Sequence, residues 1–231
     1  MKIQVYAFTQ IDQALEAAAL GVDQIGFIAG DYGLVPAELS YIRAAQLARA
    51  LEGKATRVAL TMSTDVEEIL RMDAAVQPDV IHISTDPLDV GVEAMRELRR
   101  RLPEGRRLMK AIPVDGEETP RLAAAFAGVA DLILLDTKVQ GMPGVGATGR
   151  TNDWEISRRV IQAARVPVIL AGGLSAENVA AAIHATHPWG VDSNTHTNRL
   201  GDPAAKDLQR VRRFVDAIRQ TECDLHSEAC A

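Results

Sequence analysis

The chain has 231 residues, of which 47% are hydrophobic but only 4% aromatic, so its core must be built mostly from aliphatic side chains. Such a composition favours interleaved strands and helices over an aromatic-rich sandwich. The net charge of −6 argues against non-specific binding to nucleic acid, and no apolar run approaches the roughly 18 residues that cross a membrane.

Short apolar segments alternate with longer segments of helical periodicity along the whole chain. In chain order, the pattern predicts strands over 3–8, 24–28, 57–61, 80–84, 108–114, 132–136, 167–171 and 190–194. A helix is expected after each strand, over 11–20, 40–51, 65–76, 92–102, 118–127, 155–164, 176–185 and 206–220. The longest irregular stretch, 137–152, is rich in glycine and separates the sixth strand from its helix.

Eight strand–helix units with a period of about 28 residues suit parallel strands joined by crossover helices. The strands are apolar on both faces, as expected when one face meets a barrel core and the other meets helices. An open doubly wound sheet is the competing fold, but residues 9–13 lack the glycine-rich turn that usually follows its first strand. The sequence therefore predicts a single α/β domain, a (β/α)8 TIM barrel over 1–220, followed by a polar C-terminal tail over 221–231.

Reactive groups in such barrels come from the carboxyl ends of the strands and the loops after them. Asp136 ends a buried apolar run and opens the glycine-rich stretch. Burial should raise the pKa of its carboxyl and suit it to general-acid chemistry, although an Asp that only braces the loop would fit the same pattern. His82 lies within the fourth strand, where a histidine is either a hydrogen-bonded core residue or an acid–base group.

A phosphate site is expected where the last two strands end. Gly172 and Gly173 follow the seventh strand, and Asn194 and Thr195 follow the eighth. Barrels often bind phosphate at this place, and glycine lets the backbone approach an anion closely. Two consecutive glycines are common in proteins. The phosphate site is therefore inferred from their position after the seventh strand and not from the glycines alone.

Two further groups of residues permit other chemistry. Lys110 and Lys138 could form Schiff bases if they were desolvated or close to another cation. Cys223, His226 and Cys230 could outline a metal site, but three ligands in a polar tail are weak evidence, and we expect a frayed end there. Because both cysteines lie in the tail and the chain starts without a signal-peptide pattern, we expect a reduced, cytoplasmic protein.

Several segments resemble the phosphoribosylanthranilate isomerase family of tryptophan biosynthesis, which performs an Amadori rearrangement. The resemblance covers most of the barrel. It is carried by Gly21 to Ile28 (G-A-D-x-I-G-F-I in the family), Leu134 to Asp136 (L-L-D), Gly146 to Gly149 with Asp153-Trp154 (G-G-T-G…D-W), Leu170 to Val179 (L-A-G-G-L-x-x-E-N-V), and Val191-Asp192 with Gly201 and Lys206-Asp207 (V-D…G…K-D).

The departures from the family pattern fall at the strand ends. Tyr6 stands at the place of the family's general-base cysteine, and His82 stands at the glutamine of its Q-L-H-G motif. The family's arginine after the second strand is missing, with Tyr32 its nearest counterpart, and its S-S-G-V-E motif reads 194–198 here. Tyrosine is a poor base at neutral pH because its ordinary pKa is about 10.

The resemblance implies an isomerase that needs an acid at the ring oxygen of a sugar and a base for its C2 proton. Asp136 carries over as the acid, and either His82 or Tyr6 would be the base or a polarising donor. The expected substrate-binding residues are Gly172, Gly173, Asn194, Thr195, Thr9 and Lys110.

Four functions stay open at this point. The main hypothesis is a divergent isomerase of a small, phosphorylated sugar or aminosugar. The others are phosphoribosylanthranilate isomerase itself with an atypical base, a non-catalytic ligand-binding barrel, and a Schiff-base lyase. The isomerase chemistry requires no metal or organic cofactor, and the expected partner is a phosphorylated small molecule rather than nucleic acid or membrane. We expect a monomer or a homodimer.

Overall fold

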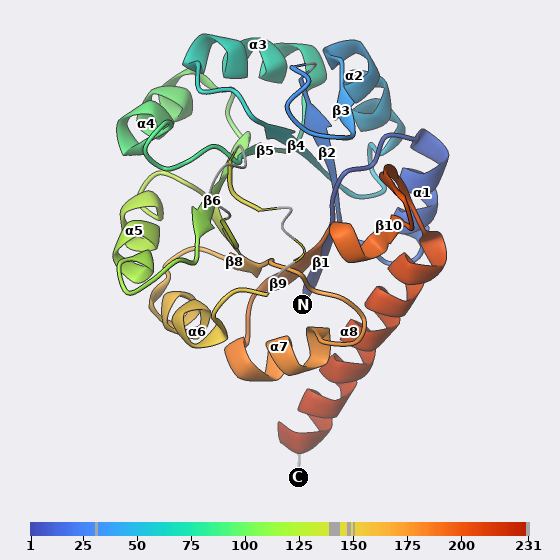
Figure 1. Ribbon diagram of the computed structural model, residues 1–231. Helices are drawn as coiled ribbons and strands as arrows, with labels where there is room; N and C mark the ends of the chain where they lie inside the picture. Colours follow the sequence, from blue (N-terminus) through green and yellow to red (C-terminus); the bar gives the residue numbers. More distant parts are fainter. Residues whose placement is uncertain (31, 139–143, 147–148, 150, 230–231) are drawn as a thin grey trace.

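The computed structural model describes residues 1–30, 32–138, 144–146, 149 and 151–229, except the side chains of 228 and 229. Parallel strands close into a barrel, because β1 pairs with both β9 and β2 (Figure 1). The predicted (β/α)8 TIM barrel is confirmed. Its strands are β1 Lys2–Val5, β2 Gln24–Ala29, β4 Thr56–Thr61, β5 Val80–Ile83, β6 Arg107–Pro113, β7 Leu132–Asp136, β8 Val168–Leu170 and β9 Gly190–Ser193.

Helices surround this barrel on the outside (Figure 1). They are α1 Ile11–Ala19, α2 Tyr41–Ala50, α3 Val66–Val76, α4 Val92–Arg101, α5 Thr119–Phe126, α6 Trp154–Ala163, α7 Val179–Thr186 and α8 Leu208–Ala229. Their starts follow local chemistry: the side chains of Ser40, Asp65 and Asp153 accept hydrogen bonds from the first turns of α2, α3 and α6.

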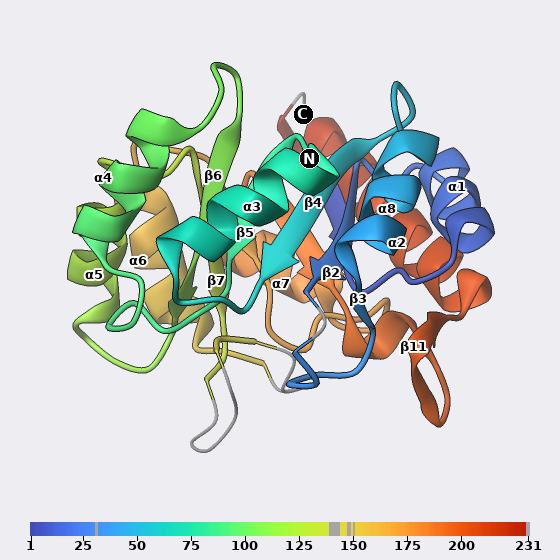
Figure 2. The same ribbon diagram turned by 90° about the horizontal axis from the view of Figure 1, so that it is seen from above.

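Three short elements lie at one end of the barrel. β3 Glu38–Leu39 pairs in parallel with the end of β2, and β10 Asn198–Arg199 and β11 Asp202–Lys206 form an antiparallel hairpin. A single 3-10 turn, Thr195–Thr197, follows β9. The β2–β3 loop and the hairpin lie on the same side of the barrel, opposite the amino terminus (Figure 2).

The alternation of side chains along each strand decides which residues face the barrel interior. On β7, Leu132 and Leu134 belong to the cluster inside the barrel, whereas Ile133 and Leu135 pack in the layer under the helices. Asp136 continues the inward series at the carboxyl end of the strand. The same alternation fills the barrel interior with one packed core. Polar side chains occupy the inward positions at the carboxyl ends of the strands.

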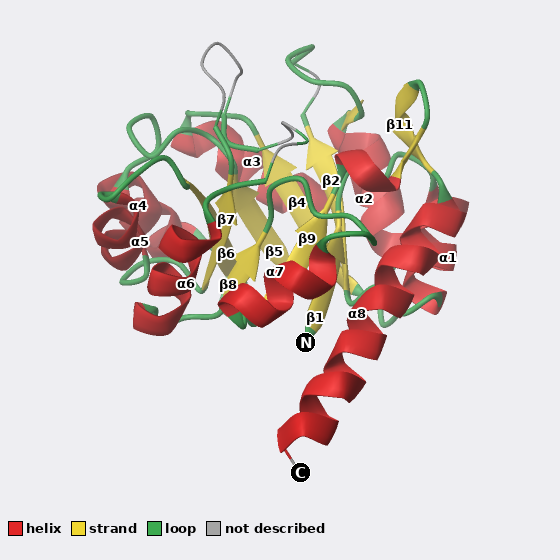
Figure 3. Cartoon of the chain, turned by 60° about the horizontal axis from the view of Figure 1, so that its bottom comes forward, coloured by secondary structure: helices red, strands yellow, loops and turns green. Residues whose placement is uncertain are grey.

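The C-terminal region differs from the sequence prediction. Lys206 lies in β11 rather than in the last helix, and α8 continues without a break through 221–229, where we expected a frayed tail. This helix extends past the barrel at the end where β1 begins (Figure 3). No helix of the described residues is long and apolar enough to cross a membrane. Within the same residues no cluster of His, Cys, Asp or Glu could hold a metal, and Cys230 lies outside them.

Candidate active site

Four polar side chains converge on one cavity at the carboxyl ends of the strands. Tyr6 follows β1, and His82, Asp136 and Asp192 lie on β5, β7 and β9, all at inward positions. The cavity has a volume of about 310 Å³. Its other lining residues are Ala7, Ile28, Val35, Pro36, Leu60, Met62, Ser84, Leu134, Val145, Gly146, Asn194, Thr195, Asn198 and Pro203.

Tyr6 and His82 form a hydrogen-bonded pair inside this cavity. The Tyr6 Oη lies 2.6 Å from His82 Nδ1, and their rings are tilted by 54°. Burial lowers the pKa of His82 to about 3, helped by the nearby charge of Lys110, and burial raises the pKa of Tyr6 well above its usual value. Both side chains are therefore neutral at pH 7. Within the described residues, His82 Nε2 has no hydrogen-bond partner.

Asp136 sits beneath the segment 144–146 of the glycine-rich loop. Its Oδ1 accepts hydrogen bonds from the backbone N–H (2.7 Å) and hydroxyl (3.3 Å) of Thr137. A Cβ on Gly146 would lie only 2.4 Å from Asp136 Oδ2, so glycine is what lets the loop cover this carboxyl. Burial raises the pKa of Asp136 to about 7, which the sequence analysis anticipated in direction. Such a carboxyl can give up a proton at neutral pH.

Asp192 is a second buried carboxyl, to which the sequence analysis assigned no role. Burial, and then the charge of Asp136, raises its pKa to about 8. The Gln4 amide of β1 donates a hydrogen bond to its Oδ1 over 3.1 Å. At neutral pH the two carboxyls therefore hold at least one proton between them. The signal in the sequence was the same as for Asp136: an acidic residue at an inward position at the end of an apolar strand.

The two glycines of the expected phosphate site lie beside the end of β9. Gly172 and Gly173 both have positive φ angles, +89° and +57°. With Asn194 and Thr195 they border a narrow hollow of about 20 Å³, which shares Asp136 and Asp192 with the main cavity. A hollow of this size holds about one water and is too small for a whole phosphate group.

Lys206 supports this end of the site from behind; the sequence analysis named it only as part of a family motif and gave it no role. Its ammonium is buried and donates hydrogen bonds to the backbone and side-chain oxygens of Asn194 (both 3.1 Å), to Thr197 Oγ1 (3.2 Å) and to Asn198 Oδ1. Phe8 lies beneath it, with 5.8 Å between the nitrogen and the ring centroid. The ammonium thus fixes the turn that carries Asn194 and Thr195.

Three residues considered from the sequence lie away from the cavity. Lys110 occupies an outward position on β6, where its ammonium donates to the carbonyls of Ile83 (3.4 Å) and Thr85. Thr9 donates to Ala204 O over 2.7 Å, and Lys138 forms an ion pair with Asp86. None of the three is among the described residues that line the cavity. We therefore leave Lys110 and Thr9 out of the binding set, and neither lysine is placed to form a Schiff base there.

The family model of N-(5'phosphoribosyl)anthranilate (PRA) isomerase matches residues 3–217. The chain belongs to the PRA isomerase family. A PRA isomerase of Rubrobacter xylanophilus is 33% identical over 223 residues, which cover 94% of this chain and 98% of that protein. One from Pseudomonas aeruginosa is 33% identical over 225 residues, covering 97% and 98%. The resemblance inferred from the motifs is confirmed, and the chain is an isomerase of the intramolecular oxidoreductase class.

Solved PRA isomerase structures share the fold. The enzyme from Thermotoga maritima superposes with a TM-score of 0.78 at 24% identity, covering 95% of this chain and 99% of that one. Another PRA isomerase was solved in complex with reduced 1-(o-carboxyphenylamino)-1-deoxyribulose 5-phosphate; it has a TM-score of 0.76 at 22% identity, with the same coverage.

Proposed function

We propose that this chain catalyses the Amadori rearrangement of an N-substituted, phosphorylated aminoaldose, with Asp136 as the acid and His82 as the base. The observation that carries the proposal is the convergence of a carboxyl whose pKa burial raises to about 7 and a neutral imidazole on one cavity. The relatives named as PRA isomerases make N-(5'-phosphoribosyl)anthranilate the first substrate to test.

The proton movements follow from the states of these groups. Asp136 donates its proton to the ring oxygen, the bond between that oxygen and C1 breaks, and the nitrogen lone pair forms a C1=N bond. His82 Nε2 then takes the proton from C2, which gives an enolamine. This becomes the 1-amino-1-deoxyketose when the imidazolium returns its proton to C1 and the C2 hydroxyl gives its proton to the Asp136 carboxylate. The substrate gains and loses the same number of protons, so acid and base end in their starting states.

Tyr6 orients the base in this scheme. When His82 Nδ1–H donates to Tyr6 Oη, the lone pair of the imidazole lies on Nε2, the nitrogen without a partner in the described structure. As His82 gains a proton, the phenol oxygen stabilises the charge on the ring. Tyr6 itself has no free base form at pH 7, because burial raises its pKa and keeps it a neutral phenol, whereas His82 is unprotonated.

The opposite end of the substrate would place its phosphate over Gly172, Gly173, Asn194 and Thr195. Hydroxyl, amide and backbone N–H donors are available there, and the buried ammonium of Lys206 lies directly behind the turn. We propose that the enzyme works as a monomer or a homodimer, as a relative from Thermotoga maritima is described as monomers generated from a dimeric enzyme.

Turnover of N-(5'-phosphoribosyl)anthranilate by the purified protein, compared with Asp136→Asn, tests the proposal. We expect activity in the wild type and a loss of about 100-fold or more in the variant, as for other positioned general acids. Growth of a tryptophan auxotroph that expresses the chain is an independent readout. Folded wild-type protein that turns over no phosphorylated aminoaldose, or equal activity in both proteins, would contradict it.

A further inference from the structure

The cavity has two chemically different halves. The acid–base groups and the proposed phosphate site lie at β1, β5, β7, β8 and β9. The other half, at β2 and β4, is lined by aliphatic side chains, of which Val35 and Pro36 come from the loop between β2 and β3. A substrate with its phosphate at β8 and β9 and its sugar at Asp136 and His82 extends its amine substituent toward this second half.

The loop that carries Val35 and Pro36 is wrapped around one carboxylate. Glu38, at the start of β3, accepts hydrogen bonds from four consecutive backbone N–H groups, those of 32–35, over 2.7 to 2.9 Å. In the pairing of β3 with β2, Glu38 lies beside Ile28, another residue of the aliphatic half. Hydrogen bonds to a charged acceptor are stronger than those between neutral groups. The Glu38 side chain therefore fixes the path of the loop and the position of Val35.

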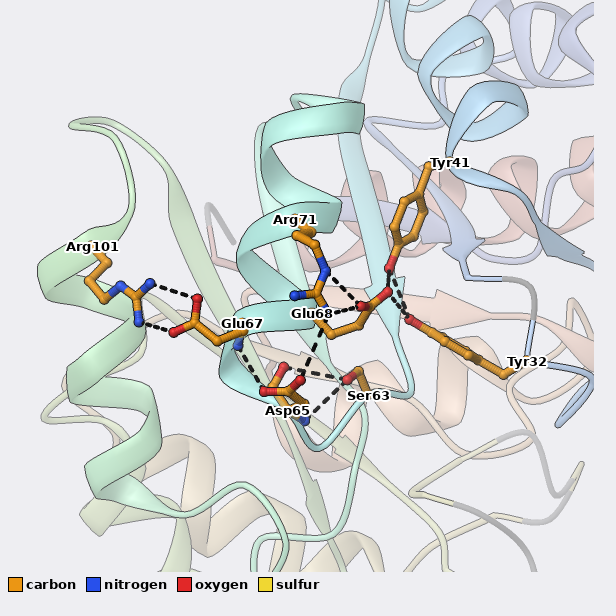
Figure 4. A network of polar contacts seen from close by, with 8 residues as sticks. All are labelled: Tyr32, Tyr41, Ser63, Asp65, Glu67, Glu68, Arg71 and Arg101. Atoms are coloured by element: carbon orange, nitrogen blue, oxygen red, sulfur yellow. Dashed lines mark hydrogen bonds and ion pairs between the residues drawn. The ribbon is translucent and has the colours of Figure 1, made fainter.

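A second anchor joins the same loop to the helix layer. Tyr32 Oη lies 2.9 Å from Tyr41 Oη and donates to a carboxylate oxygen of Glu68 on α3, also over 2.9 Å. Figure 4 shows both phenols directed at Glu68, which accepts a further hydrogen bond from Arg71 Nε over 3.0 Å. Tyr32, the nearest counterpart of the family's arginine, is not among the described residues that line the cavity. It holds the loop from outside.

An aromatic ring on the substrate nitrogen would meet a wall that is already in position. Val35 and Leu60 pack against the inner apolar cluster, to which Ile28 and Val145 belong. A ring between these side chains gains from leaving water. A wall that is fixed before binding also loses little conformational freedom when the ring arrives. Glu38 is not among the described lining residues, so it acts on the substrate through the loop.

We propose that Glu38 is a positioning residue for substrate binding, which holds Val35 and Pro36 where they contact the aromatic amine substituent. Tyr32 and Glu68 support the same loop from the helix layer. This inference rests on the proposed function for the orientation of the substrate. Because the acid–base groups lie in the other half of the cavity, loss of the Glu38 carboxylate weakens binding of the ring and leaves the chemical step unchanged.

Binding of two unreactive ligands to the wild type and to Glu38→Gln tests this role. The probes are reduced 1-(o-carboxyphenylamino)-1-deoxyribulose 5-phosphate and ribitol 5-phosphate, which keeps the phosphate and the polyol but lacks the arylamine. By calorimetry, we expect the variant to bind the arylamine ligand about tenfold more weakly and ribitol 5-phosphate less than about twofold more weakly. Equal weakening of both ligands, unchanged affinity for the arylamine ligand, or no binding of that ligand to the wild type would overturn the inference.

Steady-state kinetics with N-(5'-phosphoribosyl)anthranilate separate binding from chemistry. In Glu38→Gln, KM should rise about tenfold with little change in kcat, the pattern of lost uniform binding. A lower kcat at an unchanged KM would contradict the proposal. Failure of the proposed function would show differently, as a wild type that binds the arylamine ligand but turns over no aminoaldose. The binding comparison decides the role of Glu38 in that case too.

Two further variants show whether the loop is the cause. Glu117→Gln makes the same chemical change in the loop after β6, where the exposed carboxylate accepts a hydrogen bond from Arg159 over 2.7 Å, and it should leave both affinities unchanged. Tyr32→Phe removes the second anchor but keeps Glu38, so it should weaken the arylamine ligand in the same direction, by about threefold. Equal effects of Glu38→Gln and Glu117→Gln, or an unchanged affinity in Tyr32→Phe, would contradict the assignment.

Discussion

Tyr6 Oη and His82 Nδ1 lie 2.6 Å apart, although 76 residues separate them in the chain. The same two positions are occupied by cysteine and glutamine in the family motifs. The two departures that looked independent in the sequence are therefore one contact in the structure. A phenol at position 6 needs a partner for its buried hydroxyl, and a histidine provides one. In the proposed mechanism the base therefore lies on β5 rather than at the end of β1.

This contact predicts strongly coupled effects on activity. His82→Gln removes the proposed base and should lower kcat by about 100-fold or more, whereas Tyr6→Phe removes only the orienting oxygen and should cost less. Because both act through one imidazole, the double variant should be little worse than His82→Gln alone. Kinetics of the four proteins measure the coupling, with the exposed His184→Gln as a matched control. Losses that simply multiply would argue against a shared role.

The pH dependence of activity should report on Asp136. Because the proposed mechanism needs its carboxyl protonated, and its pKa is raised to about 7, kcat/KM should fall as pH rises above about 7. The imidazole adds no opposing limb above pH 5, since burial holds its pKa near 3. A pH profile from 5 to 9 tests this. A kcat/KM that stays level or rises between pH 7 and 9 would exclude Asp136 as the acid.

The same carboxyl should make the folded state less stable as pH rises. Its pKa is about 7 in the folded chain against 3.8 for a free aspartate side chain, so the folded chain binds more protons between these limits. The stabilisation is complete below about pH 4 and is lost as pH rises to about 7. Asp136→Asn should therefore lose less stability than wild type between pH 4 and 8, by up to about 4 kcal/mol. Denaturant unfolding of both proteins at pH 4 and pH 8 measures this difference. Equal losses of stability in the two proteins would refute the raised pKa of Asp136.

The barrel could be predicted from the sequence because each strand is a short apolar segment that is followed by a segment of helical periodicity. The predicted strand over 132–136 matches β7 residue for residue, and Asp136 was located from that alone. The same alternation also places Lys110 outward, since Met109 and Ala111 face the interior. Lys110 was expected to bind substrate because proximity to a strand end was weighed without the direction of its side chain, which points away from the cavity.

Other features depend on contacts between distant segments and leave no local pattern. Lys206 was assigned to a helix because it follows a loop and precedes helical periodicity, yet it pairs with Asn198 in a hairpin. Its role appears only when 194–198 fold back around its ammonium. The pairing of Tyr6 with His82 is of the same kind, because a single sequence carries no record of which strand ends meet.

Lys206 should act on substrate binding more than on the chemical step. Lys206→Met removes the donor to Asn194, Thr197 and Asn198, so KM for a phosphorylated substrate should rise about tenfold or more with little change in kcat. Lys110→Met is the matched control, because Lys110 is also buried, donates to carbonyls, and lies over an aromatic ring, that of Phe126. It should leave KM unchanged. Equal effects of the two variants on KM would make the role of Lys206 merely structural.

Gly26 is the position that makes room for the phenol of Tyr6. A Cβ at residue 26 would lie 2.3 Å from Cδ1 of the Tyr6 ring, and that ring cannot move without breaking its contact with His82. Gly26→Ala should therefore lower the free energy of unfolding by about 1–3 kcal/mol through overpacking. In a Tyr6→Ala background the clash is absent, so the same substitution should cost little or nothing. Chemical denaturation of the four proteins gives the coupling energy.

Gly128→Ala is the control, since its Cβ would meet only a carbonyl at 3.7 Å. If Gly26→Ala cost the same with and without the phenol, the ring would not lie against the β2 backbone, and the orientation of His82 by Tyr6 would lose its structural basis.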